Sequence, residues 1–98
     1  MRALWRGQLI AESDNTMIIE GSHYFPPNSL HKDYLKRNNR RSLCYWKGLV
    51  SYYDVIANGQ VEESAAWYYP KPTRLSKAIM RKDFSNYVAF WKDVKVVE

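Results

Sequence analysis

Hydrophobic and polar positions follow a strand-like pattern most clearly in two neighbouring segments, Leu49–Ala57 and Gln60–Tyr69. Both are rich in β-branched and aromatic side chains, and Asn58-Gly59 lies between them. This dipeptide favours two-residue hairpin turns, because both turn residues then adopt positive φ. Such a turn pairs Ala57 with Gln60 and so sets the register of the two strands. We therefore expect a β-hairpin over these residues.

This register places six side chains on one face of the hairpin. Five of them are apolar or small and the sixth is a tyrosine, so we expect this face to point toward the core. The six are Val50, Tyr52, Ile56, Val61, Ala65 and Trp67. Tyr68 points the other way and is expected at the surface. Asp54 would face Glu63, and facing like charges are unfavourable. Either a bulge near Glu62-Glu63 shifts the pairing, or a cation lies between the two carboxylates.

Shorter strands are predicted elsewhere in the chain. Residues 5–13 form a strand interrupted at Gly7, and the other strands are expected over residues 17–20, 87–91 and 94–97. With the hairpin, these segments give a mainly β class: a compact twisted sheet or open barrel with one or two short helices.

Two short helices and a loop complete the expected elements. Thr73 caps a helix over Arg74–Arg81, whose buried stripe has the spacing i, i+3, i+4. That stripe consists of Leu75, Ala78 and Ile79. Asn28 or Ser29 caps an earlier helix that runs through Leu30, Tyr34 and Leu35. Lys36–Arg41 is expected to be a cationic loop.

Composition indicates a single soluble globular domain over residues 1–98. The 98 residues are 46% hydrophobic and 26% charged, which does not fit a disordered chain. Aromatic residues make up 15%, with eight tyrosines and four tryptophans. Their rings bury much apolar area in a small protein, while the tyrosine hydroxyl and the indole N–H remain able to bond a partner.

Several classes of protein are disfavoured by what the sequence lacks. One cysteine excludes an internal disulfide framework and a cysteine-rich zinc site, and His23 and His31 have no ligand-like spacing. No apolar run approaches the ~18 residues of a membrane helix, and residues 1–7 lack the apolar stretch of a signal peptide. We therefore expect a cytoplasmic protein without metal, cofactor or membrane contact, either a monomer or a weak homo-oligomer.

Positive charge is concentrated in two segments, residues 32–47 and residues 71–82. They carry six and five of the 15 lysines and arginines, and Asp33 is the one acidic residue within them. Such segments attract phosphate-rich partners, and they also keep proteins soluble.

Lys47 and Cys44 are the candidate reactive residues. Lys47 lies in the turn before the hairpin and is flanked by aromatic residues, so its ammonium can be presented to an anion or desolvated toward a nucleophilic amine. Its alternative role is a surface lysine whose stem covers Trp46. Cys44 could be a thiolate activated by Lys47, or a small buried hydrophobic residue.

Four aromatic residues are the candidate ligand-binding set: Tyr24, Tyr52, Trp67 and Tyr69. Strand alternation places the last three on one face of the hairpin. Buried phenols need hydrogen-bond partners, so several hydroxyls converging near a lysine are typical of a ligand pocket. Core packing is the alternative role of these rings.

A series of short motifs spread over nearly the whole chain resembles a known family. In order, they are Trp5, Gly7, Ala11-Glu12-Ser13, Tyr24-Phe25-Pro26, Cys44-Tyr45-Trp46-Lys47-Gly48, Ser51-Tyr52-Tyr53, Ala65-Ala66-Trp67-Tyr68-Tyr69-Pro70 with Pro72, and Val88-Ala89-Phe90. This order and spacing resemble "domain of unknown function 427", a family of small, mostly bacterial single-domain proteins. The resemblance implies a metal-free, mainly β fold that is β-tent-like, as in methionine sulfoxide reductase B domains.

The resemblance does not decide whether the protein is an enzyme. The family is in places labelled nucleotidyltransferase-like. Nucleotidyl transfer generally needs carboxylates paired one residue apart to hold Mg²⁺. No such pair follows Gly21-Ser22, and the adjacent Glu62-Glu63 would point to opposite faces of a strand. The residues therefore do not support the label.

Three hypotheses of function follow. The leading one is a small domain that binds a small anionic molecule in an aromatic pocket with Lys47 at its mouth. The second is a nucleic-acid binder that uses the two basic segments, although the aromatic RNP-type motif is absent. The third is a protein-interaction module that presents an exposed hairpin edge.

Overall fold

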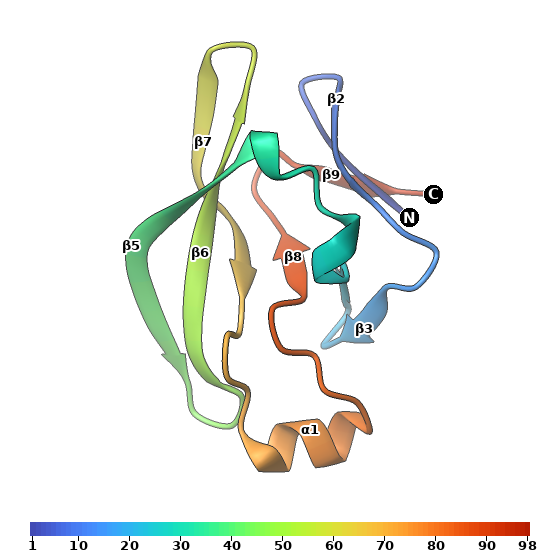
Figure 1. Ribbon diagram of the computed structural model, residues 1–98, viewed down its shortest axis with the longest axis vertical. Coiled ribbons are helices and arrows are strands. Elements are labelled where there is room, and N and C mark those ends of the chain that lie inside the picture. The colour runs from blue at the N-terminus through green and yellow to red at the C-terminus, as the bar shows by residue number, and fades with distance from the viewer.

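The chain folds into nine β-strands, one α-helix and two 3₁₀ turns (Figure 1). The structure is a computed structural model and describes all residues, 1–98. The strands are β1 (Arg2–Trp5), β2 (Gln8–Glu12), β3 (Met17–Ile19), β4 (Ser22–Tyr24), β5 (Leu35–Cys44), β6 (Gly48–Ala57), β7 (Gln60–Tyr68), β8 (Val88–Phe90) and β9 (Lys95–Val97). The helix is α1 (Arg74–Met80), and the 3₁₀ turns are η1 (Pro27–Ser29) and η2 (Lys32–Tyr34).

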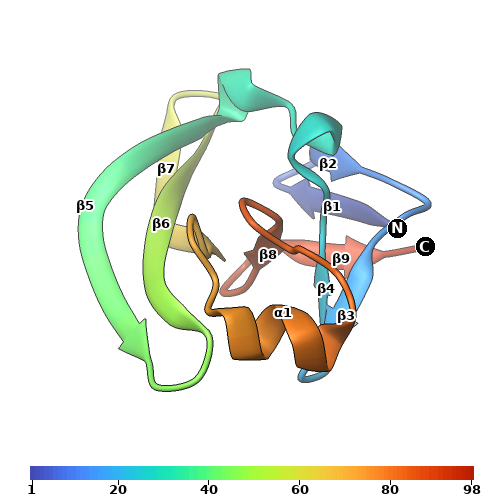
Figure 2. The same cartoon turned by 60° about the horizontal axis from the view of Figure 1, so that its bottom comes forward.

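The strands form three antiparallel sheets and do not close into a barrel. Their orders are β5-β6-β7-β8, β2-β1-β9 and β3-β4. An isolated bridge between Phe25 and Val88 brings the end of β4 beside β8. α1 lies at the end of the molecule where β5 turns into β6, and Figure 2 shows it between that turn and β3. The mainly β prediction is confirmed, with 53% of residues in strands.

The β6–β7 hairpin turns at Asn58-Gly59, as the sequence predicts. Asn58 has φ +52° and Gly59 has φ +75°, the two positive values of a type I′ turn. Ala57 pairs with Gln60, and Ile56 pairs with Val61. The predicted register is therefore correct next to the turn.

A bulge at Asp54 shifts the register farther from the turn. Asp54 alone lies between the paired residues Tyr53 and Val55, whereas three residues of β7, 63–65, lie between their partners. Asp54 Oδ1 accepts hydrogen bonds from the backbone N–H of Ser64 (2.9 Å) and from Asn38 Nδ2 (2.7 Å). Asp54 and Glu63 therefore do not face each other, because a bulge shifts the pairing. This is one of the two alternatives that the sequence left open.

The bulge also changes which residues face each other near the site. Tyr52 pairs with Trp67, whereas the unshifted register had placed it opposite Ala65. Counted from the Ala57–Gln60 pair, the unshifted register also places Val50 opposite Trp67, and this pair is wrong. Because Tyr52 and Trp67 are direct cross-strand neighbours, their side chains emerge together on one face of the sheet.

Both faces of the β6–β7 pair are covered, so the prediction of a single buried face is wrong. One face contributes Val55, Ala57 and Tyr68 to a cluster of 13 buried residues that includes residues of β1 and β2. The other face contributes Val50 and Tyr52 to a second cluster of seven. Tyr68, expected at the surface, is buried because the β1–β2–β9 sheet packs over its face.

Two members of the predicted buried face lie outside both clusters. Ile56 is half-buried, and Val61 is 53% exposed. Both lie next to the Asn58-Gly59 turn, where the buried residues Val55 and Ala57 occupy the opposite face. Ile56 and Val61 therefore pair with each other as predicted. They lie, however, on the face that points away from the core at this end of the hairpin.

The predicted cationic loop Lys36–Arg41 is part of β5 instead. β5 is the edge strand of its sheet, and Lys36, Arg37, Arg40 and Arg41 are exposed on it. Charged side chains are common on edge strands because they prevent pairing with another chain. The polar sequence of this strand reflects its position at the edge and does not indicate a loop.

α1 has the predicted cap but not the predicted buried stripe. The Thr73 hydroxyl accepts a hydrogen bond from the Ser76 backbone N–H at 3.1 Å. Leu75 and Ile79 are 62% and 58% exposed, and Ser76 is fully buried. The helix turns its serine inward because its first residues are tied to the β5–β6 turn, where the Thr73 N–H donates to the Lys47 carbonyl at 3.1 Å.

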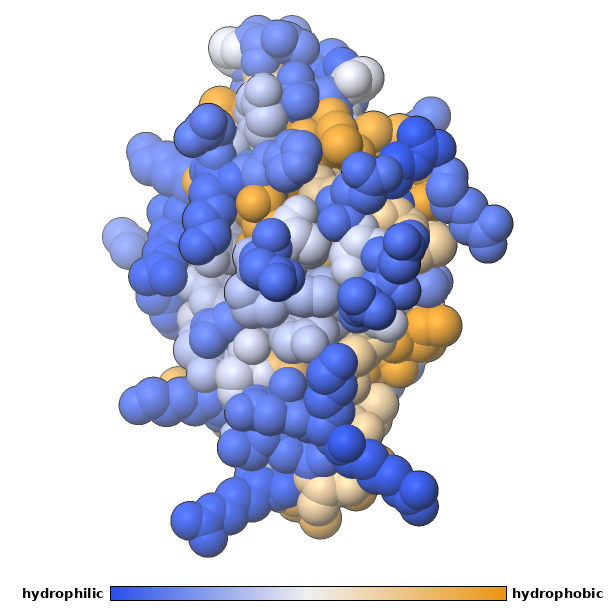
Figure 3. Space-filling view, turned by 45° about the vertical axis from the view of Figure 1, so that its right-hand side comes forward, coloured by the Kyte–Doolittle hydropathy of each residue, from blue (hydrophilic) through white to orange (hydrophobic).

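The remaining predicted strands are present, whereas the predicted early helix is not. The strand interrupted at Gly7 is the β1–β2 hairpin, and residues 87–91 and 94–97 contain β8 and β9. The expected helix after Asn28 is replaced by the two 3₁₀ turns, so the chain has one α-helix. Figure 3 shows one face of the molecule covered mostly by hydrophilic side chains, with hydrophobic surface in patches between them.

We predict that Gly59→Val lowers the free energy of unfolding by about 1 kcal/mol or more, because a β-branched residue is strained at φ +75°. Gly59→Asn is the control, since asparagine tolerates this conformation. Urea unfolding of both variants measures the difference. Equal stability of the valine and asparagine variants would contradict the type I′ turn.

We also predict that Asp54→Ala lowers the free energy of unfolding by about 1–3 kcal/mol, because the Ser64 N–H loses its acceptor and the Asn38 amide loses one of its two acceptors. Asp93→Ala, at an exposed position after β8, is the matched control and should change stability by less than about 0.5 kcal/mol. An Asp54 variant as stable as the control would show that the bulge does not depend on this carboxylate.

Candidate functional site

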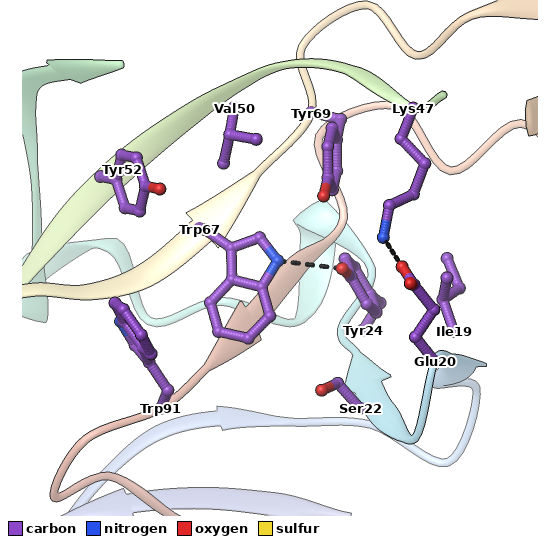
Figure 4. Close-up of a pocket in the computed structure, with 10 residues that line it drawn as sticks. All are labelled: Ile19, Glu20, Ser22, Tyr24, Lys47, Val50, Tyr52, Trp67, Tyr69 and Trp91. Atoms are coloured by element: carbon purple, nitrogen blue, oxygen red, sulfur yellow. Dashed lines mark hydrogen bonds and ion pairs between the residues drawn. The ribbon is translucent and has the colours of Figure 1, made fainter. Parts of the chain in front are cut away.

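A cavity of about 330 Å³ opens beside the second cluster of seven buried residues, which we call the second aromatic cluster (Figure 4). Ten residues line it, and seven of them are hydrophobic. They are Ile19, Glu20, Ser22, Tyr24, Lys47, Val50, Tyr52, Trp67, Tyr69 and Trp91. All five residues that the sequence analysis proposed for ligand binding are among them: Lys47, Tyr24, Tyr52, Trp67 and Tyr69. The structure therefore brings the predicted set together around one cavity.

Lys47 is the only cation that lines the cavity, and it is buried. The residue is 4% exposed, and its Nζ lies 5.1 Å from the ring centroid of Tyr69 and 5.3 Å from that of Trp46. Both distances lie within the ~6 Å of a cation–π contact. The Lys47 ammonium also forms an ion pair with Glu20, whose side chain is 57% exposed. Glu20, not Lys47, is the exposed member of the pair.

Two opposing effects act on the Lys47 ammonium. Burial lowers the pKa of Lys47, because desolvation disfavours its charged form. The adjacent carboxylate of Glu20 favours the charged form. The Glu20 carboxylate is therefore the contact that favours the charged ammonium at this buried position.

The β5–β6 turn holds Lys47 in place through its contacts with the segment before α1. Gly48 has φ +111°, and a Cβ there would lie 3.2 Å from the Lys71 carbonyl oxygen. The Thr73 hydroxyl donates to the carbonyl of Trp46, and the Thr73 N–H donates to that of Lys47. The turn therefore needs a glycine after Lys47 and is fixed on both sides of the lysine.

Tyr24, Trp67 and Tyr69 form a hydrogen-bonded group next to Lys47. Trp67 Nε1 donates to the Tyr24 hydroxyl at 2.9 Å, and the rings of Tyr24 and Tyr69 stack with centroids 6.4 Å apart. Burial raises the pKa of both phenols, because desolvation disfavours the phenolate. Both phenols are therefore neutral at pH 7, and the Tyr24 hydroxyl, which accepts from Trp67, keeps its own hydrogen for another acceptor.

The other end of the cavity is aromatic and has no unpaired polar group. Trp67 and Trp91 meet edge to face with centroids 5.7 Å apart. The Tyr52 hydroxyl is 2.8 Å from Ser42 Oγ, and Trp91 Nε1 donates to the Ser64 carbonyl. Figure 4 shows Lys47 and Glu20 at one end of the cavity, and Tyr52 and Trp91 at the other. The cavity thus has a polar end and an apolar end.

Cys44 does not line the cavity. It is half-buried at the end of β5 and packs against the second aromatic cluster. No group of three or more His, Cys, Asp or Glu side chains could hold a metal ion. A catalytic role of Cys44 or Lys47 stays a prediction.

Cations of the two basic segments also come together outside this cavity. Arg41, from the first segment, and Lys71, from the second, line a separate cavity together with Leu49, Ser51 and Pro70. Arg40 is directed elsewhere, and its guanidinium lies 4.7 Å from the centroid of the Tyr52 ring. Binding of nucleic acid by these segments stays a prediction.

Glu20 is the lining residue whose role the sequence analysis missed. It occupies the two-residue turn between β3 and β4 with φ +52°, followed by Gly21 with φ +83°. The Glu-Gly turn is visible in the sequence, but its approach to Lys47 depends on β4 pairing next to β8 through Phe25. Ile19, Ser22, Val50 and Trp91 were missed as lining residues for the same reason, since their contacts are not local.

Comparison with protein families now identifies the chain's relatives. The family model described as "Domain of unknown function (DUF427)" matches residues 1–98. The chain belongs to this family. The resemblance proposed from the sequence motifs is therefore confirmed. A comparison with curated proteins finds no match to this DUF427 chain. None of its helices is long and apolar enough to cross a membrane.

We predict that Tyr24→Phe in this DUF427 protein lowers the free energy of unfolding by about 1 kcal/mol, because the Trp67 indole N–H loses its acceptor in a partly buried site. Tyr45→Phe is the matched control, since that tyrosine is exposed in the β5–β6 turn. Urea unfolding monitored by tryptophan fluorescence measures both changes. If the two variants lose equal stability, the Trp67–Tyr24 hydrogen bond is not a stabilising contact.

Proposed function

We propose that this DUF427 protein binds a small anionic molecule in the aromatic cavity, with the acid group of the ligand on Lys47. The observation that carries the proposal is the buried ammonium of Lys47 at the cavity wall. An ammonium has three N–H donors, and the one hydrogen-bond acceptor of Lys47 is Glu20. Lysines are rarely buried without full pairing, so the remaining donors favour a ligand that brings acceptor oxygens to this position.

The hydrogen-bond groups at the polar end support an acidic ligand. Lys47, the Tyr24 hydroxyl and the Ser22 hydroxyl are donors that line the cavity, and the carboxylate of Glu20 is acceptor only. A group rich in acceptors, such as a carboxylate or a phosphate, complements such a set. A cationic ligand would be repelled by Lys47.

The shape and lining of the cavity support a small ligand with an apolar part. Its volume of about 330 Å³ lies at the lower end of the range of ~300–1,000 Å³ for small-molecule sites. Such sites combine a mostly apolar lining with a few placed polar groups, as this cavity does. The description of the family assigns it no activity, and no reaction is assigned to the site.

We predict that Lys47→Met weakens binding of small aromatic anions by roughly tenfold or more, since a hydrogen bond to a charged group contributes about 1.5–3 kcal/mol. Phenylacetate and phenyl phosphate are suitable probes for isothermal titration. Methionine keeps the length and the apolar stem of lysine, so the fold should survive. Lys95→Met, at an exposed position on β9, is the matched control and should bind as the wild type does.

The nucleic-acid hypothesis predicts a different result from the same proteins. A single-stranded oligonucleotide should then bind with an affinity that falls steeply with salt. Arg41→Gln combined with Lys71→Gln should abolish that binding, because these residues join the two basic segments. Arg40 is left unchanged, since its contact with Tyr52 would disturb the aromatic cavity. Oligonucleotide binding that is lost in this double variant, with no binding of either aromatic anion, would overturn the proposal.

A further inference from the structure

We infer that the ligand of this cavity is an aromatic monocarboxylate, and that Glu20 holds the place of its acid group in the ligand-free protein. This inference rests on the proposed function and deepens it in two respects. It names the chemical class of the ligand, and it assigns Glu20 the role of a competitor built into the chain.

The Lys47–Glu20 ion pair is asymmetric, and this makes Glu20 displaceable. The side chain of Lys47 is 5% exposed, whereas that of Glu20 is 57% exposed. If the pair opens, the Glu20 side chain can rotate into solvent at little cost, because it is already mostly hydrated. Lys47 cannot leave its surroundings of Tyr69 and Trp46. The ammonium therefore stays in place and the carboxylate is the exchangeable partner.

The backbone at Glu20 is a short exposed turn in the cavity wall. Glu20 and Gly21 form a two-residue turn between β3 and β4, which have three residues each and form a two-stranded sheet of their own. Lys47, by contrast, lies in a turn fixed by Thr73. Figure 4 shows the side chains of Glu20 and Lys47 reaching toward each other from opposite sides of the cavity.

Charge balance favours a monocarboxylate over a phosphate. Lys47 is the one cation among the ten lining residues. If a monoanion takes the place of Glu20, the ammonium again has one negative partner and the buried charge is balanced. A phosphate dianion would leave one negative charge uncompensated next to apolar walls, which is costly. Sites for phosphate usually add arginine or further donors with charge, and this cavity has none.

The apolar end of the cavity favours a ring that carries no polar substituent. The Tyr52 hydroxyl, the Trp67 indole N–H and the Trp91 indole N–H each have a hydrogen-bond partner inside the protein. These three residues therefore offer a ligand only their ring surfaces. Aromatic rings pack edge to face or offset with centroids about 4.5–7 Å apart, and Trp67 and Trp91 already pack in this way. A ligand ring would extend the same arrangement.

Competition by Glu20 lowers the apparent affinity of the site. When the binding-competent state is only a fraction of the population, the apparent dissociation constant rises by the inverse of that fraction. Removing the carboxylate of Glu20 should therefore tighten binding of a carboxylate ligand. A stabilising wall residue would have the opposite effect, because its removal would weaken binding.

The test compares three proteins by isothermal titration: the wild type, Glu20→Gln and Glu12→Gln. Phenylacetate and indole-3-acetate are the carboxylate probes, phenyl phosphate is the phosphate probe, and indole is the neutral probe. We expect Glu20→Gln to bind both carboxylates about tenfold more tightly than the wild type, as it would if about one-tenth of the wild-type molecules had the pair open. Glu12→Gln removes an exposed carboxylate on β2 outside the cavity and should bind as the wild type does. Glu20→Ala should change affinity in the same direction as Glu20→Gln.

A second measurement follows Glu20 directly. In wild-type protein labelled with ¹³C at glutamate side chains, the carboxyl resonance of Glu20 should move as phenylacetate is added. Those of Glu12 and Glu63 should not. An unmoved Glu20 resonance while the ligand binds would show that the ion pair persists, and would overturn the competitor role.

The outcomes separate this inference from the proposed function. If no probe binds the wild type, Glu20→Gln or Glu20→Ala, both the proposed function and the inference fail. If binding depends on Lys47 but Glu20→Gln binds carboxylates no more tightly, the competitor role alone fails. If phenyl phosphate binds more tightly than phenylacetate, or indole binds as tightly as indole-3-acetate, the ligand class is wrong while the aromatic site stands.

Discussion

The β6–β7 strand pair is the constraint on which the rest of the molecule depends, because both of its faces are buried. Val55, Ala57 and Tyr68 pack against the β1–β2–β9 sheet, while Tyr52 and the residues around it pack on the other side. In a chain of 98 residues, one strand pair thus serves two clusters. The bulge at Asp54 makes this compatible with a hairpin, since it moves Tyr52 opposite Trp67 and keeps the two rings on the side of the cavity.

The second cluster differs from the first because its aromatic residues do not fill the space between them. The larger cluster is a continuous apolar core, whereas the second leaves a cavity that ends at the Lys47 ammonium. Burying a charge is costly unless it is paired. The fold pairs Lys47 with Glu20 from a short exposed turn, which satisfies the charge in the ligand-free protein and leaves the pairing exchangeable. Under the proposed function, the same ion pair stabilises the empty cavity and selects an anionic ligand.

The features that could be predicted from sequence are those with local causes. The turn at Asn58-Gly59 and the cap at Thr73 depend on the conformations and hydrogen bonds of residues close in the chain. The aromatic residues of the cavity could be proposed because strand alternation and the family motifs both point to them. The features that were missed have distant causes. β5 is polar because it is an edge strand, and Leu75 is exposed because contacts with another turn orient α1. Glu20 reaches Lys47 only through the placement of β4 beside β8.

A crystal structure of the protein with phenylacetate bound tests the central claim most directly. The account predicts the ligand carboxylate against Lys47 Nζ, the ring among Tyr52, Trp67 and Trp91, and the Glu20 side chain turned out into solvent. A ligand bound elsewhere, such as in the cavity between Arg41 and Lys71, with the Lys47–Glu20 ion pair intact, would contradict it.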